Sequence, residues 1–255
     1  MVSVIQAIFL GILQGLTEWL PVSSSGHLVI AQQIFTIEVP VFFDILLHLG
    51  TAAVVVWFMR KEFISMLKAF LRFDFSGKYG KWFLYLVAGS IITGFIGFFG
   101  HDFFTSLFSE VRYVAYALMF TGVFLLLIER FEKQGKLVFK HSLVMGLAQG
   151  LAIVPGISRS GATVGTALMT GANREEAAKF SFMLSVPAII GAGMFEFLSQ
   201  DVAYILTISV LVGVICAMIT GYLSLKLFLK IVLEKKLWIF GIYCLAVSVS
   251  LLMFI

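Results

Sequence analysis

Three side chains that could carry out acid–base or nucleophilic chemistry lie in one short stretch, TEWLPVSSSGH, at residues 17–27. Glu18 offers a carboxylate, Ser24 a hydroxyl, and His27 an imidazole. At the start of a helix, a spacing of three residues places Ser24 and His27 on the same face. His27 could therefore take the proton of Ser24, or attack an electrophile itself.

A second stretch, PGISRSGAT at residues 155–163, carries a cation instead. Arg159 lies there among the hydroxyl groups of Ser158, Ser160 and Thr163. A guanidinium with neighbouring hydroxyls has the donors to hold a phosphate group bidentately. Each stretch is also expected to lead into a helix, whose first free N–H groups favour an anion. The two stretches together predict a phosphate site.

These residues lie in a chain with the composition of an integral membrane protein. Of its 255 residues, 60% are hydrophobic and only 13% are charged, and the mean hydropathy is +1.05. A carboxylate in such an apolar setting is expensive and usually functional. The net charge of +4 comes from short basic runs between apolar segments, which argues against nucleic acid as a partner. Cys216 and Cys244 have no metal-ligand or disulfide spacing.

Eight apolar stretches organise the chain. Six are long enough to cross the roughly 30 Å of hydrocarbon in a bilayer: 41–59, 82–100, 113–129, 180–198, 203–225 and 237–255. Two others, 2–36 and 142–172, are interrupted by Pro, Ser and Gly. A single lipid-facing helix does not tolerate such interruptions, so each is predicted to be a re-entrant hairpin of two helices.

The basic residues predict which connections face the cytoplasm, because cytoplasmic loops carry an excess of Lys and Arg. Residues 60–81 hold six of them, 130–140 hold four and 226–236 hold four. The connections 101–112 and 199–202 are acidic and should face outward. Both termini are then outside, and the two hairpins enter the membrane from opposite faces.

An internal repeat supports the same plan. GILQGLTEWLPVSSSG (11–26) aligns without a gap to GLAQGLAIVPGISRSG (146–161), with seven identities in sixteen positions. We therefore expect an all-α polytopic membrane protein, with 1–255 as a single membrane domain. It is divided into repeats at about 1–130 and about 141–255, each with one re-entrant hairpin and three transmembrane helices. An odd number of spans per repeat inverts the second copy, so the hairpin tips should face one another.

This plan also fits other classes of function. An inverted-repeat transporter or flippase for a phosphorylated lipid or an anion would use Glu18 as a coupling-ion site and Arg159 to bind the anion. An intramembrane serine protease is less favoured, because an arginine suits a phosphate better than a peptide carbonyl. Asp44 and His48, four residues apart, are expected to form an internal polar pair.

Two motifs carry a resemblance to a known family. QGLTEWLPVSSSGH and PGISRSGAT resemble the two signatures of the bacterial undecaprenyl-diphosphate phosphatases of the bacitracin-resistance (BacA/UppP) family. The resemblance implies hydrolysis of undecaprenyl diphosphate, a polyprenyl diphosphate lipid, to the monophosphate and inorganic phosphate. This reaction recycles the lipid carrier of cell-wall glycans and is associated with bacitracin resistance. The expected location is the plasma membrane, with the active site open to the outer face; a homodimer is left open.

The resemblance also implies site residues. The family's acidic element falls on Gln14 and Glu18, and its serine, histidine and arginine on Ser24, His27 and Arg159. Ser24, activated by His27, is expected to attack the terminal phosphorus, with His27 itself as the alternative nucleophile. A divalent cation, Mg²⁺ or Ca²⁺, would be held by Glu18 and the substrate phosphates. The predicted substrate-binding residues are Gln14, Ser23, Ser25, Gly26, Ser158, Ser160, Gly161 and Thr163.

Overall fold

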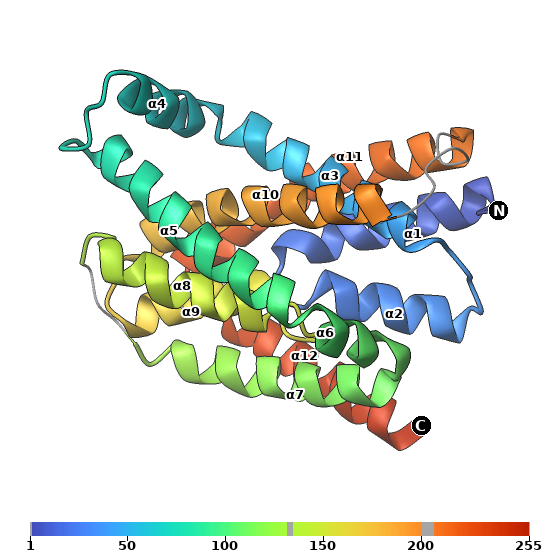
Figure 1. The fold of residues 1–255 in the computed structure, drawn as a ribbon. Helices are drawn as coiled ribbons and strands as arrows, with labels where there is room; N and C mark the ends of the chain where they lie inside the picture. Colours follow the sequence, from blue (N-terminus) through green and yellow to red (C-terminus); the bar gives the residue numbers. More distant parts are fainter. Residues whose placement is uncertain (1, 132–134, 200–206, 255) are drawn as a thin grey trace.

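The computed structural model describes residues 2–131, 135–199 and 207–254, and every named element in this part of the chain is a helix (Figure 1). Five helices are long and apolar enough to cross a membrane, which confirms a polytopic all-α membrane protein. They are α3 (Val41–Phe58), α5 (Lys78–Phe99), α7 (Val111–Ile128), α10 (Arg174–Ser199) and α11 (Ile208–Leu233). The last predicted span corresponds to the shorter apolar helix α12 (Trp238–Phe254). Parts of two predicted spans, 203–206 and 255, lie outside the described residues.

The first interrupted stretch forms two helices, α1 (Val4–Trp19) and α2 (Ser24–Ile34). Pro21 accounts for the break, because a residue before proline is pushed out of the helical region, and Leu20 is extended. The side chain of Ser23 then caps α2 by accepting from the Gly26 N–H.

The second interrupted stretch likewise forms α8 (Phe139–Leu151) and α9 (Arg159–Met169), with Ser158 as the cap of α9. Figure 1 shows the two hairpins entering from opposite ends of the bundle and meeting near its middle. Both chain ends lie at the end of the bundle that holds the short helix α6 (His101–Ser106). The arrangement is the one that an inverted repeat requires, although the repeat itself stays a prediction.

Each hairpin is fixed by a close helix–helix contact through glycines. α1 packs along α11, where Gly11 lies against the backbone of Gly213. α8 packs along α5, where a Cβ added to Gly146 would lie only 2.6 Å from the Gly89 carbonyl oxygen. Small residues allow such approach, which is the main source of helix association in a bilayer. The first helix of each hairpin is thus held by the second spanning helix of the other half.

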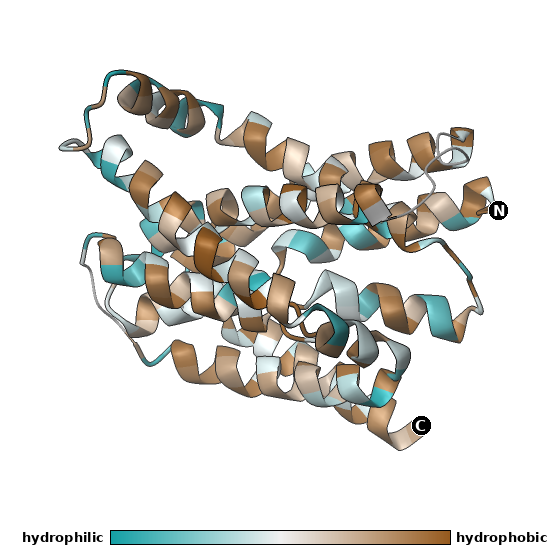
Figure 2. Ribbon diagram, in the orientation of Figure 1, coloured by the Kyte–Doolittle hydropathy of each residue, from teal (hydrophilic) through white to brown (hydrophobic). Residues whose placement is uncertain are grey.

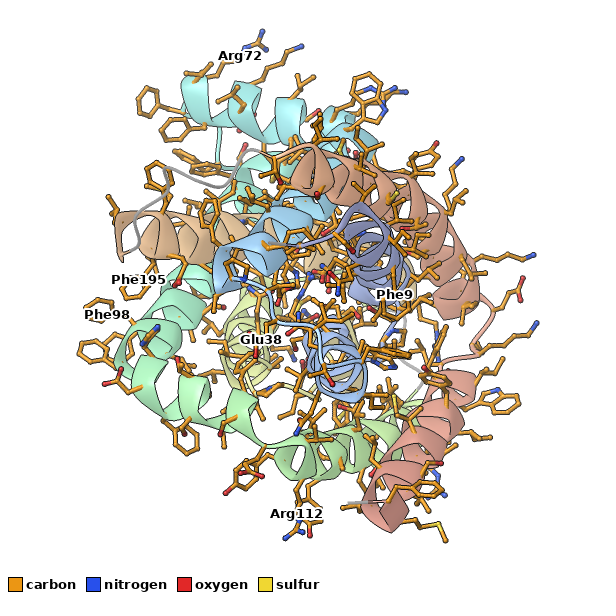
Figure 3. All side chains as sticks on the ribbon, turned by 90° about the vertical axis from the view of Figure 1, so that its right-hand side faces the viewer. Phe9, Glu38, Arg72, Phe98, Arg112 and Phe195 are labelled. Atoms are coloured by element: carbon orange, nitrogen blue, oxygen red, sulfur yellow. The ribbon has the colours of Figure 1, made fainter. Side chains whose placement is uncertain are left out.

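The predicted loop 60–81 contains a helix, α4 (Arg60–Leu71), which the sequence analysis did not predict because its basic residues indicated a cytoplasmic connection. Figures 1 and 3 together show α4 lying across the direction of the spanning helices. Three of its apolar side chains, on one side of the helix, are at least half exposed: Ile64, Leu67 and Leu71. This pattern, beside basic residues, is typical of a helix in the membrane interface.

Hydrophobic residues make up most of the spanning helices (Figure 2), and many large hydrophobic side chains are exposed on the outside of the bundle. Among the described residues, polar side chains are also buried inside it, including Gln14, Glu18, Ser23 and Thr163. Because an unpaired polar group in an apolar interior is costly, these side chains must satisfy one another or a ligand.

Candidate active site

The two hairpin tips contact each other directly. Ser23 Oγ accepts hydrogen bonds from the Gly156 N–H at 3.0 Å and from the Gly26 N–H at 3.3 Å. Ser23 adopts a left-handed conformation with φ of 68°, which is uncommon for a residue other than glycine. The second tip is held on α7, because the Thr121 hydroxyl donates to the Gly156 carbonyl and accepts from the Ser158 N–H, at 2.9 and 3.1 Å. These bonds fix the two helix starts relative to each other.

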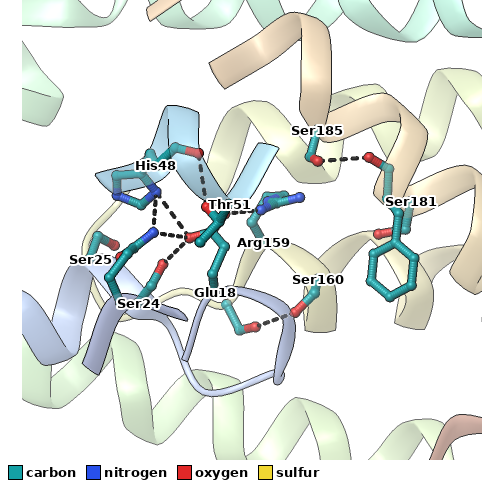
Figure 4. A network of polar contacts seen from close by, with 12 residues as sticks. Glu18, Ser24, Ser25, His48, Thr51, Arg159, Ser160, Ser181 and Ser185 are labelled. Atoms are coloured by element: carbon teal, nitrogen blue, oxygen red, sulfur yellow. Dashed lines mark hydrogen bonds and ion pairs between the residues drawn. The ribbon is translucent and has the colours of Figure 1, made fainter. Parts of the chain in front are cut away.

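Glu18 is the centre of the polar network between the tips (Figure 4). Its Oε2 accepts from the Ser24 hydroxyl at 2.6 Å and from Gln14 Nε2 at 2.8 Å, and it lies 2.9 Å from His48 Nδ1. Its Oε1 forms an ion pair with Arg159 Nη2. The Glu18 side chain is only 3% exposed, so a charged carboxylate is sustained there by these partners.

Arg159 retains donor capacity beyond this ion pair. Its guanidinium lies 5.1 Å from the ring centroid of Trp19, which fixes the plane of the group. One of its nitrogens, Nη1, is buried and has no hydrogen-bond partner among the residues that the structure describes. Because an unsatisfied buried donor is costly, and more so on a charged group, this atom indicates that an acceptor from a ligand completes the site.

The starts of two helices add further donors to the same place. Ser24 is the first residue of α2 and Arg159 the first residue of α9, and both line one cavity. The N-terminus of a helix carries free N–H groups and the positive end of the helix dipole. Two such ends and an arginine form a strong anion site, and phosphate fits it.

The cavity has a volume of about 590 Å³ and a wall of mixed character. Glu18, Ser24 and Arg159 form a polar part of its wall, and most of the other lining residues are apolar, although His101 and Glu196 also line it near the ends of α5 and α10. Phe98, at the end of α5, and Phe195, near the end of α10, lie at the rim of the molecule in Figure 3. The cavity therefore offers a polar head site continuous with an apolar path, as an amphiphilic substrate needs.

The structure brings six of the predicted site residues into the wall of this cavity: Glu18, Ser23, Ser24, Ser25, Ser158 and Arg159. The other predicted residues lie beside the cavity or behind it. Gln14 lies behind Glu18, and the Thr163 hydroxyl donates to the Arg159 carbonyl at 2.8 Å.

Three further predicted residues have structural hydrogen bonds at the tips. The Gly26 and Gly161 N–H groups donate to the cap hydroxyls of Ser23 and Ser158, and the Ser160 hydroxyl donates to the Leu20 carbonyl at 3.4 Å. These contacts stabilise the hairpin tips. A role in holding substrate stays a prediction for all three.

His27 faces away from the Ser24 hydroxyl. Its Nδ1 lies 2.8 Å from the Ser23 carbonyl oxygen, and its Nε2 lies 2.8 Å from the Tyr243 hydroxyl. The two rings stack with centroids 5.7 Å apart. His27 is absent from the described wall of the cavity, and Ser24 bonds to Glu18 instead. A role of His27 as the base for Ser24 therefore has no supporting contact and stays a prediction.

The sequence analysis assigned no site role to His48. The expected pair with Asp44 does not form, because both Asp44 oxygens accept from Gln32 Nε2, at 3.0 and 2.8 Å, while His48 faces Glu18. The sequence feature that could have indicated a role for His48 is a histidine inside an apolar span. Its partner Glu18 lies on α1, so the sequence of α3 alone does not reveal the contact.

The residues at the tips are a poor fit for a resident divalent cation. No group of three or more His, Cys, Asp or Glu residues suited to a metal occurs in the described part of the chain. Both oxygens of Glu18 are already occupied by donors, one of them the Arg159 guanidinium. Gln14 Oε1 is a buried acceptor with no partner, but a single neutral oxygen does not make a cation site.

Comparison with known proteins gives matches to one family over nearly the whole chain. The family model described as "Bacitracin resistance protein BacA" matches residues 7–250. A protein named undecaprenyl-diphosphatase from Methanobrevibacter smithii is 40% identical, over 98% of this chain and 97% of its own. One of the same name from Carboxydothermus hydrogenoformans is 42% identical, over 97% and 95%. A third, from Halothermothrix orenii, is 38% identical, over 98% and 97%.

Proposed function

The chain belongs to the family of the bacitracin resistance protein BacA, and from this premise we propose that its hairpin-tip site hydrolyses undecaprenyl diphosphate to undecaprenyl phosphate and inorganic phosphate. The enzyme is a membrane-embedded phosphoanhydride hydrolase that recycles a cell-wall lipid carrier and supports bacitracin resistance.

One observation carries the proposal: the serine, the carboxylate and the arginine meet in a cavity whose remaining wall is mostly apolar. Arg159 Nη1, which has no partner in the described part of the chain, can bind a terminal phosphate oxygen while Nη2 remains on Glu18. The N–H groups at the starts of α2 and α9 neutralise the remaining charge. Phosphoryl transfer depends mainly on such positioning and charge stabilisation.

Ser24 is the nucleophile that the geometry favours. Its Oγ forms a bond to the terminal phosphorus as the bridging P–O bond breaks and undecaprenyl phosphate leaves. The hydroxyl proton passes to Glu18 Oε2, its hydrogen-bond acceptor at 2.6 Å. Water then attacks the phosphorus of phosphoserine and the P–Oγ bond breaks. Glu18 returns its proton to Ser24 Oγ, and the protons of the water leave with inorganic phosphate.

Glu18 thus takes the role expected of His27. Both ring nitrogens of His27 are engaged, with Ser23 and Tyr243, so attack on phosphorus by His27 would require the hairpin tip to rearrange. The role of His27 is instead structural: its Nδ1 hydrogen-bonds with the Ser23 carbonyl and so supports the strained turn that precedes Ser24.

We infer that the substrate reaches the site from the outer face. The cavity reaches the ends of α5 and α10, beside the connection 101–112 that is predicted to be outside. The basic loops lie at the opposite end of the bundle, where α4 begins. The prenyl tail would lie along Phe98, Phe108 and Phe195 and continue into the bilayer.

A requirement for a divalent cation, Mg²⁺ or Ca²⁺, stays a prediction. The cation would arrive with the diphosphate and take most of its ligands from phosphate oxygens, because Glu18 is already paired. Phosphate release measured with EDTA, and then with added Mg²⁺ or Ca²⁺, tests this requirement.

The proposed function is tested by phosphate release from undecaprenyl diphosphate by the purified protein in detergent. The expected result is turnover by the wild type and loss of turnover in Glu18→Gln, Ser24→Ala and Arg159→Ala. Transport cannot occur in detergent. A folded wild type that binds the lipid but releases no phosphate, with or without divalent cations, would instead favour a transporter or flippase.

A further inference from the structure

We propose that His48 is a positioning residue of the hydrolytic site, whose Nδ1–H directs the Glu18 carboxylate at the Ser24 hydroxyl. The inference rests on the proposed function and adds a residue from a third element, the spanning helix α3, to the two hairpins. It concerns the geometry of Glu18 rather than contact with the substrate.

The contact joins helices that are distant in the sequence. His48 Nδ1 lies 2.9 Å from Glu18 Oε2, the same oxygen that accepts from the Ser24 hydroxyl (Figure 4). Gln14 Nε2 approaches the cluster from the same side, 2.8 Å from Glu18 Oε2 and 2.7 Å from His48 Nδ1. We place the His48 proton on Nδ1 because a carboxylate is the strongest acceptor in contact with it.

Gln14 Nε2 shares this contact, because it lies 2.7 Å from His48 Nδ1; with the Nδ1 proton directed at Glu18, the Gln14 amide donates to Glu18 Oε2 instead. The other polar neighbours of His48 are engaged elsewhere. Asp44, one turn earlier on α3, is occupied by the Gln32 amide at 3.0 and 2.8 Å. Arg159 approaches Glu18 through the other oxygen, Oε1. The remaining face of the imidazole lines the cavity, and the His48 side chain is 24% exposed.

The two donors on Glu18 fix its carboxylate in complementary ways. Arg159 holds Oε1 on the side of the second hairpin, and His48 holds Oε2 on the side of α3. With both present, the carboxylate cannot rotate away from Ser24 without breaking a hydrogen bond. Without His48, only Arg159 and Gln14 would orient it, and Arg159 must also bind phosphate.

The test compares two substitutions with opposite properties. Asparagine places an amide nitrogen close to the position of the imidazole Nδ1, so His48→Asn retains a donor to Glu18. Leucine keeps apolar bulk and has no donor. The measurements are kcat and KM for phosphate release in detergent, with the thermal unfolding midpoint of each variant.

The matched control is His141→Leu. His141 is a histidine of the same bundle that is more deeply buried than His48; its Nδ1 accepts from the Val138 N–H at 2.8 Å, but it is not part of the described cavity wall. This variant should lower the unfolding midpoint and leave kcat unchanged. It shows what the loss of a buried histidine alone does to the protein.

A positioning role predicts that His48→Leu lowers kcat by roughly 10- to 100-fold, as expected for a lost hydrogen bond to a charged group, with little change in KM. His48→Asn should restore most of that loss. The inference is overturned if His48→Leu turns over like the wild type, or if leucine preserves kcat better than asparagine, since a packing role predicts that order. A wild type that releases no phosphate would overturn the proposed function as well.

Discussion

At the scale of single residues, the site is defined by which polar atoms are satisfied and which are not. Glu18 has a partner on each oxygen, whereas Arg159 Nη1 has none among the described residues although it is buried. An unsatisfied buried donor on a charged group is costly, and an acceptor from a ligand would remove that cost. We therefore predict that Arg159 Nη1 marks the position of one phosphate oxygen.

The sequence predicts Glu18 and Arg159 because a charged residue at an interruption of an apolar stretch is expensive, and Ser24 because of its spacing from His27. It does not predict that His27 turns away. The three-residue spacing correctly places Ser24 and His27 in the first turn of α2. However, the direction of each side chain is set by partners from other helices, Glu18 on α1 and Tyr243 on α12.

Arg159→Lys tests the role of the unpaired guanidinium nitrogen. Lysine keeps the charge but has no planar fork, so it cannot hold Glu18 and phosphate together. We expect kcat/KM to fall by roughly 10- to 100-fold, the worth of one hydrogen bond to a charged group. The control is Arg174→Lys, since Arg174 is also a buried arginine, paired with Glu129 and not part of the described cavity wall. Equal activity of Arg159→Lys and the wild type would remove Arg159 Nη1 from the mechanism.

At the scale of elements, the two hairpins and the meeting of their tips are predicted by the sequence, but the hydrogen bonds that join the tips are not. Pro21 and the repeated Ser-x-Ser-Gly pattern mark both turns in the sequence. The bond from the Gly156 N–H to Ser23 Oγ joins residues 133 positions apart, so no local pattern reveals it. The helix α4 was missed for a different reason, because its basic residues were counted only as evidence of a cytoplasmic loop.

Gly156→Ala tests how tightly the second tip is held. Gly156 has φ of 101°, and an added Cβ would lie 2.5 Å from the Val114 carbonyl oxygen and 2.7 Å from Ala117 Cβ, both on α7. The substitution should lower the thermal unfolding midpoint in detergent, because both the backbone and α7 must shift. Gly94→Ala is the matched control, since a Cβ there meets nothing within 4 Å. Equal midpoints for the two variants would contradict the tight contact.

At the scale of the whole molecule, the distribution of basic residues follows the two ends of the helical bundle. The chain ends and α6 lie at one end of the bundle, and α4 with its basic residues lies at the other. The cavity extends to the first of these ends. Through glycines, α1 of the first hairpin packs on α11 of the second half, and α8 of the second hairpin packs on α5 of the first half. Two inverted halves are expected to pack against each other in this reciprocal way.

Cysteine labelling in intact cells tests this orientation. In a background without Cys216 and Cys244, an exposed cysteine is placed at Ser109, between α6 and α7, or at Ser76, between α4 and α5. A membrane-impermeant maleimide should label Ser109→Cys in intact cells, and Ser76→Cys only after permeabilisation. The reverse pattern would place the cavity on the cytoplasmic side.

The identity of the covalent intermediate tests the central claim most directly. Undecaprenyl diphosphate labelled at its terminal phosphorus is mixed with enzyme, and parallel samples are quenched in acid, which preserves phosphoserine, and in base, which preserves phosphohistidine. The account predicts label on Ser24 in the acid-quenched sample and none in Ser24→Ala. Label on His27 in the base-quenched sample, with turnover retained by Ser24→Ala, would contradict it.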